Sequence, residues 1–172
     1  PLYENACRAK WGQSLEEAQA ESGLIWSIFS EVAAETEGAW IHSPKTPEAI
    51  TTPSADNRPI SFPYTKLMVA NSSVNQGAAF IVTSLEAALA RGIAEDRLIY
   101  VGLGAHAEEP GNILARDTYS DSVSMSETLE KALEFNGLTP GDLDSAELYS
   151  CFPCVPKLAR RVIGWPVDRP MT

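Results

Sequence analysis

The chain has 172 residues, a formal net charge of −10 and a pI near 4.6, and it contains three cysteines. This acidity argues against nucleic acid and anionic membrane as partners, because both bind basic surfaces. No signal peptide and no apolar run of about 18 residues is present, so we expect a cytoplasmic protein without a membrane span, whose thiols stay reduced.

The first third of the sequence predicts a helix followed by a connector. Ser14 and Glu17 form a capping-box pattern, and apolar or small residues then recur at steps of three and four from Leu15 to Val32. The stripe is shorter than the about three to four heptads of a coiled coil, so we expect it to pack on its own domain. Five prolines within residues 43–63 favour extended backbone there.

The remaining two thirds alternate apolar runs with helical patterns, which predicts an α/β fold. Expected strands lie at 78–83, 98–103 and 146–148, and expected helices at 85–91, 125–136 and about 154–163. Each of these helices ends at a glycine, namely Gly92, Gly137 and Gly164. Strands that are apolar on both faces are typical of a sheet covered on both sides, so we expect layered βαβ units.

Polar groups gather where the expected strands begin or end. Residues 71–76 carry short side chains that donate and accept hydrogen bonds, and Gly77 allows a ligand to approach the backbone closely. In a sheet of this kind ligands bind at strand ends, although such a loop can also be an ordinary surface loop. His106 follows an expected strand and is therefore a candidate general base.

Two stretches make the chain resemble the thiolase superfamily, nearest to the sterol-carrier-protein type. Residues 71–79 (NSSVNQGAA) resemble the family passage N-[AS]-S-x-x-[ND]-x-G-A-A. Residues 149–152 (YSCF) occupy a slot that reads N-E-A-F in many thiolases and H-D-C-F in the sterol-carrier branch. The resemblance covers the whole chain, and residues 57–152 carry most of it.

The resemblance implies a partial thiolase-like fold. Residues 1–63 would be a helical loop-domain segment with its Pro-rich connector, and residues 64–172 an incomplete C-terminal half-domain. The implied activity is acyl transfer on coenzyme A thioesters, of the acetyl-CoA acetyltransferase type, with coenzyme A as part of the substrate and no separate cofactor. The nucleophilic cysteine of the family's first half and its G-H-P motif have no counterpart here, so we expect an internal fragment that is inactive alone.

The resemblance also implies individual site residues. Tyr149 stands where the family has an Asn or His that helps to form an oxyanion hole, and we treat it with His106 as a catalytic candidate. Asn71 and Ser73 match positions that contact the pantetheine arm of coenzyme A. The coenzyme A phosphates would need basic side chains, for which this acidic sequence offers Arg58, Lys66, Arg91, Arg97, Arg116, Lys157, Arg160 and Arg161.

The spacing Cys151-x-x-Cys154 at a helix start leaves three interpretations open. It could lower a thiol pKa for redox chemistry, form half of a zinc site with His42 and His106, or place a cysteine as a small core residue. The last interpretation is the commonest, and we expect no metal.

Two partner hypotheses follow from the expected fold. If its sheet is incomplete, its unpaired edges should recruit the remainder of the parent thiolase or a second copy, giving a homo-oligomer. The competing hypothesis is a non-catalytic subunit that binds acyl-CoA or protein and completes its site with a partner chain.

Overall fold

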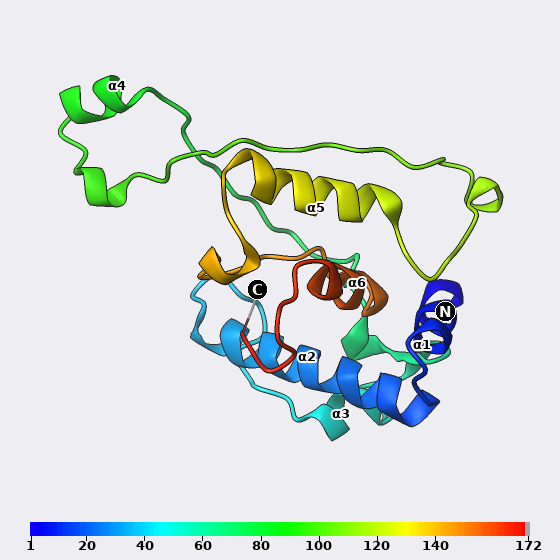
Figure 1. The fold of residues 1–172 in the computed structure, drawn as a ribbon. Helices are drawn as coiled ribbons and strands as arrows, with labels where there is room; N and C mark the ends of the chain where they lie inside the picture. The colour runs from blue at the N-terminus through cyan, green and yellow to red at the C-terminus, as the bar shows by residue number, and fades with distance from the viewer. Residues whose placement is uncertain (171–172) are drawn as a thin grey trace. The chain divides into compact units, whose positions relative to one another are not determined.

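The computed structural model describes residues 1–170 and shows two compact units (Figure 1). Unit 1 contains Pro1–Ala70 and the chain from Gly104 onward, and unit 2 contains Asn71–Leu103. None of the helices in residues 1–170 is long and apolar enough to cross a membrane.

Unit 1 begins with three helices, α1 (Leu2–Lys10), α2 (Leu15–Glu35) and α3 (Pro47–Thr51). The predicted capping box is confirmed: the Glu17 N–H donates to Ser14 Oγ at 3.1 Å, and the Ser14 N–H donates to Glu17 Oε2 at 2.7 Å. Helix α3 crosses α2 at Gly23, where an added Cβ would lie 2.9 Å from the Thr51 methyl group. A side chain at that position would therefore force the two helices apart.

The Pro-rich connector is a folded part of unit 1. Strands β1 (Pro59–Ser61) and β2 (Tyr64–Thr65) form an antiparallel hairpin, followed by the 3₁₀ turn η1 (Lys66–Met68). The buried Asn57 amide organises the connector, because it donates to the Ala49 and Ile50 carbonyls and accepts the Leu67 N–H. The sequence predicted the extended backbone here but not the hairpin.

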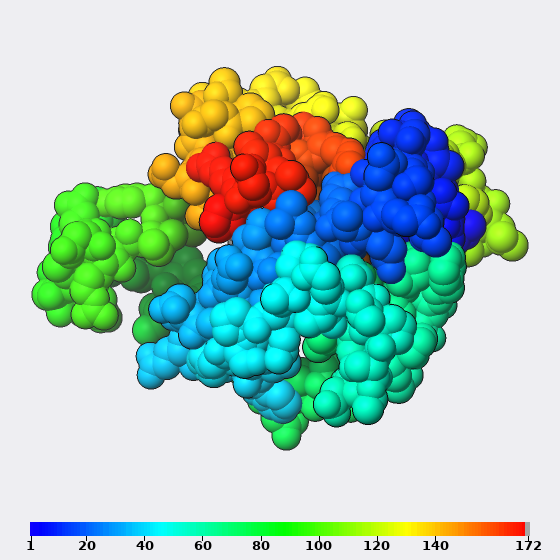
Figure 2. Space-filling model, turned by 90° about the horizontal axis from the view of Figure 1, so that it is seen from below, coloured from blue at the N-terminus to red at the C-terminus, as the bar shows by residue number. Residues whose placement is uncertain are grey.

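The C-terminal part of unit 1 contains η3 (Ile113–Ala115), α5 (Val123–Phe135), η4 (Pro140–Asp142) and α6 (Cys154–Val162). The predicted helices are confirmed within two residues, and Gly137 and Gly164 have the positive φ that a glycine stop requires. Ile163 and Trp165 form a buried cluster with Phe29 of α2 and apolar residues of α5. The C-terminal segment accordingly lies against α2 (Figure 2).

Unit 2 contains the short helix α4 (Leu85–Ala90) and the 3₁₀ turn η2 (Glu95–Arg97). Ser84 caps α4 by accepting the Ala87 N–H at 3.1 Å, which agrees with the predicted helix. Gly92 follows with a positive φ, as expected.

The predictions of strands at 78–83, 98–103 and 146–148 are wrong. Within residues 1–170, none of these stretches pairs with another strand. No ladder forms at any of them, and the β1–β2 hairpin is the sheet that the described chain contains. The apolar side chains of the first two runs face solvent, with Phe80 88%, Ile81 92% and Ile99 91% exposed. A strand exists only through hydrogen bonds to a neighbour, and no neighbouring strand is available within this part of the chain.

A buried polar network holds unit 1 together. The Lys157 ammonium group of α6 donates to Glu4 Oε1 of α1 at 2.5 Å and to the Ala18 carbonyl of α2 at 2.8 Å. The Tyr64 hydroxyl of β2 donates to the other Glu4 oxygen at 2.9 Å. Glu4 and Lys157 are almost completely inaccessible to solvent, so this network joins four elements that are distant in the sequence.

We predict that Lys157→Met destabilises unit 1 by about 3–5 kcal/mol, because it leaves the Glu4 carboxylate buried and unpaired. Urea unfolding followed by circular dichroism measures this change. The matched control is Lys131→Met, which breaks the exposed pair with Glu134 and should cost less than about 1 kcal/mol. Equal effects of the two substitutions would show that the buried pair does not hold the helices.

The exposed apolar runs of unit 2 predict self-association. Unpaired extended segments with bare apolar faces pair with other chains, so the purified chain should be larger than a monomer by light scattering at low micromolar concentration. Ile81→Lys with Ile99→Lys should shift it toward the monomer. Leu114→Lys, at an exposed apolar residue of unit 1, should not, and a compact monomeric parent chain would contradict the prediction.

Candidate functional site

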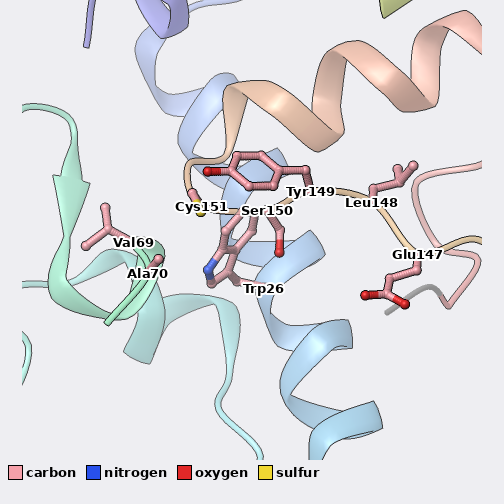
Figure 3. Close-up of a pocket in the computed structure, with 8 residues that line it drawn as sticks. All are labelled: Trp26, Val69, Ala70, Glu147, Leu148, Tyr149, Ser150 and Cys151. Atoms are coloured by element: carbon pink, nitrogen blue, oxygen red, sulfur yellow. The ribbon is translucent and has the colours of Figure 1, made fainter. Parts of the chain in front are cut away.

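An open cavity of about 650 Å³ lies in unit 1 (Figure 3). Three segments form it: α2, the chain after η1, and the chain that leads into α6. The residues that line it are Trp26, Val69, Ala70, Glu147, Leu148, Tyr149, Ser150 and Cys151. Its volume falls within the range of small-molecule sites, about 300–1,000 Å³.

The walls of the cavity are tied to the buried parts of unit 1. The Ala70 N–H donates to the Cys151 carbonyl at 3.2 Å, which joins two of the lining segments. Phe152 packs on the buried Tyr64 with ring centroids 5.8 Å apart, and Leu148 packs on the cluster around Trp165. The segment 148–152 is therefore anchored on both sides of Tyr149.

Tyr149 presents its phenol at the cavity. Its side chain is 71% exposed and forms a hydrogen bond with the Cys151 side chain, which raises the pKa of Tyr149 above its usual value. The hydroxyl is consequently protonated at neutral pH and can donate a hydrogen bond to a ligand oxygen. The sequence predicted a position at the end of a buried strand, whereas the structure shows an accessible side chain on an irregular segment.

His106 lies outside the cavity lining. Its side chain is 80% exposed, and its Nε2 lies 3.4 Å from Glu108 Oε1 at the surface. The neighbouring Glu109 is different: its carboxylate accepts from Ser122 Oγ at 2.8 Å and pairs with Arg116, which ties this loop to the start of α5.

Asn71 and Ser73 belong to unit 2. Both are exposed, and the Ser73 N–H donates to Asn71 Oδ1 at 3.0 Å, so the two residues form an Asx turn. Asn71 directly follows Ala70 in the chain, and Ala70 lines the cavity of unit 1.

The cysteines divide into buried and accessible thiols. Burial raises the pKa of Cys7 to about 12, and burial also raises the pKa of Cys154 despite its hydrogen bond with Tyr64. A redox-active Cys-x-x-Cys motif needs a lowered thiol pKa, so this environment disfavours that interpretation. His42 lies at the surface with Nδ1 3.3 Å from the Ala34 carbonyl, and residues 1–170 contain no group of three potential metal ligands.

Three of the basic residues considered for phosphate binding are engaged elsewhere. Lys157 is buried against Glu4, and Arg160 is buried with its guanidinium on the Trp165 and Pro166 carbonyls. Arg161 stacks on Trp11 at 3.6 Å and donates to both Glu21 oxygens. The sequence suggested these residues as a phosphate site, and their role in unit 1 is structural instead.

Sequence reasoning missed the part that Trp26 and Val69 play in the cavity. Trp26 lies in the amphipathic helix beside the apolar stripe, where an aromatic residue is ordinarily read as core. The available signal was its size: a large ring at the border of the stripe can contact both the core and a cavity.

Comparison with known proteins identifies a solved structure of the same fold. No protein-family profile and no curated protein matches the sequence. The chain does match the crystal structure of a monomeric SCP2-thiolase-like protein type 1 from Mycobacterium smegmatis, with 33% sequence identity and a TM-score of 0.86. The match covers 98% of this chain and 37% of that protein.

The chain therefore has the α/β fold of part of an SCP2-thiolase-like protein. Within residues 1–170 this part is mostly helical, with one small two-stranded sheet. The thiolase resemblance of the sequence is confirmed at the level of the fold.

The cysteine environments predict an order of alkylation. At pH 8 iodoacetamide should modify Cys151 first, since it is partly exposed, while Cys7 and Cys154 should react much more slowly because they are buried and their raised pKa values keep them protonated. Peptide mass spectrometry against time measures the three rates. In 8 M urea the rates should converge, and equal rates in the folded chain would contradict the assigned burial.

Proposed function

We propose that this chain is a piece of a thiolase-like acyltransferase that acts on acyl-coenzyme A thioesters, of the acetyl-CoA acetyltransferase type. The supporting observation is the match over 98% of the chain to an SCP2-thiolase-like protein at 33% identity. The chain spans 37% of that protein's length, so the activity proposed belongs to the complete protein and the chain alone is inactive.

The cavity beside Tyr149 supports a role in holding the thioester. Its phenol is exposed and protonated, and its single O–H can turn from the Cys151 side chain to a ligand, where it would donate to a carbonyl oxygen and to the oxyanion that forms when the thioester is attacked. In the complete protein Asn71 and Ser73 would contact the pantetheine arm. His106 is the second proposed catalytic residue, as a proton acceptor.

The nucleophile is proposed to come from outside this chain. Cys7 and Cys154 are buried and held protonated, and a protonated thiol is a poor nucleophile. Cys151 is partly exposed, and its side chain is hydrogen-bonded to Tyr149. This arrangement suits a chain that contributes the oxyanion side of a site completed elsewhere.

A second candidate function is a non-catalytic one. The exposed apolar runs around Ile81 and Ile99 favour a subunit that pairs with strands of another chain. Such a subunit would bind acyl-CoA or protein without transferring the acyl group. The partner would be the remainder of the parent thiolase or a second copy.

Substitution of Tyr149 separates these functions. In the complete protein Tyr149→Phe should lower kcat for acyl transfer by about 10²–10³, the loss typical of one oxyanion donor, because the ring remains but the donor is gone. Steady-state release of coenzyme A measures kcat, and calorimetry measures thioester affinity.

The control is Tyr100→Phe, which removes an exposed hydroxyl bonded to Glu95 and should leave kcat unchanged. A Tyr149→Phe enzyme within a factor of about three of its parent would remove Tyr149 from the catalytic site. Thioester binding without any acyl transfer by the parent protein would favour the non-catalytic subunit.

A further inference from the structure

Within residues 1–170, Glu147 is the one charged side chain among those that line the cavity beside Tyr149. The other lining side chains are aromatic, aliphatic or neutral polar, and none of them is a lysine, an arginine or a histidine. The lining therefore contributes a negative charge without a positive one. By Coulomb attraction such a cavity favours a cation over an anion.

The Glu147 carboxylate is not used by the fold of the described chain. No ion pair of residues 1–170 includes it, and its side chain is exposed. The carboxylates of Glu4, Glu21 and Glu109 are different, because each accepts from a lysine or an arginine. The two oxygens of Glu147 are therefore available to a ligand.

Two aromatic side chains, Trp26 and Tyr149, also line the cavity (Figure 3). The face of an aromatic ring attracts cations, and the indole of tryptophan does so most strongly. The guanidinium groups that lie over rings in residues 1–170 use other aromatic residues. A carboxylate combined with aromatic rings is the chemistry that recognises an organic ammonium group.

The cavity has room for a carbonyl group and a cation together. In Figure 3 the phenol oxygen of Tyr149 and the carboxylate of Glu147 lie at opposite ends of the labelled segment. The volume of about 650 Å³ corresponds to about twenty groups of the size of a water molecule, at about 30 Å³ each. A ligand whose carbonyl oxygen meets the phenol can therefore direct a second group to the carboxylate.

We propose that the cavity binds a methylated ammonium group, with Glu147 as its counter-ion and Trp26 as its aromatic wall. The inference rests on the proposed function for the thioester, and it makes the substrate an acyl-coenzyme A whose acyl chain ends in that ammonium group. A primary ammonium would need acceptors for three N–H donors. Val69 and Leu148 offer aliphatic walls instead, and methyl groups pack on such walls.

The test compares choline with its neutral isostere, in which a carbon atom replaces the nitrogen. Each is titrated into the complete protein while the NMR signal of the Trp26 indole N–H, assigned by Trp26→Phe, is followed. The charge should make choline bind about tenfold more tightly than the isostere, because it gains both the ring and the carboxylate. Glu147→Gln should reduce this preference to about threefold, since only the ring contribution remains.

The matched control is Glu37→Gln, which changes the net charge equally in an exposed turn outside the cavity lining and should leave the preference near tenfold. Equal effects of the two substitutions would mean that overall charge attracts choline, and would overturn the inference. Equal affinities of choline and its isostere for the parent would overturn it as well. That comparison needs no variant, so it decides the question even if Glu147→Gln does not fold.

A thioester pair separates this inference from the proposed function. Calorimetry compares trimethylammoniobutanoyl-CoA with the isostere that carries carbon in place of nitrogen, and the cationic thioester should bind about tenfold more tightly. A Glu147-dependent preference for choline without binding of either thioester would support the cation site and overturn the proposed function. Equal binding of both thioesters would support the proposed function and overturn the inference.

Discussion

The buried contact between Glu4 and Lys157 is the constraint on which the architecture of unit 1 depends. Both side chains lose their water on folding, and such a cost is offset only when each charge finds a close partner and further hydrogen bonds. The Ala18 carbonyl and the Tyr64 hydroxyl provide those bonds. The network therefore joins helices α1, α2 and α6 and strand β2 through buried, directional hydrogen bonds.

The same buried residues also support the segment that lines the cavity. Tyr64 packs on Phe152, which directly follows the cavity segment that includes Tyr149 and Cys151. Helix α2 contacts the network through the Ala18 carbonyl and lines the cavity through Trp26. The network around Glu4, Lys157 and Tyr64 is buried and the Tyr149 phenol is accessible, so the site combines a packed frame with a donor that a ligand can reach.

Unit 2 shows that a strand depends on a neighbouring backbone as well as on its own composition. Its apolar runs have the composition of central strands, but composition supplies only side chains that can be buried, and the ladder needs a second backbone at about 4.8 Å. Ile81 and Ile99 face solvent within this chain for that reason. The caps of α4 at Ser84 and Gly92, which need only neighbours along the chain, form as the local sequence dictates.

The sequence by itself determined the features that depend on near neighbours: the capping box at Ser14, the glycine-terminated helices and the thiolase-like pattern that includes Tyr149. The tertiary structure alone decided which of the polar residues would meet. Glu4 and Lys157 are 153 positions apart, and Lys157 reads as a phosphate ligand until its burial is known. Likewise, Trp26 lines the cavity, and His106 lies outside its lining. Local signals act through bonds along the backbone, whereas pairing and burial depend on how distant segments pack, which no single stretch of sequence encodes.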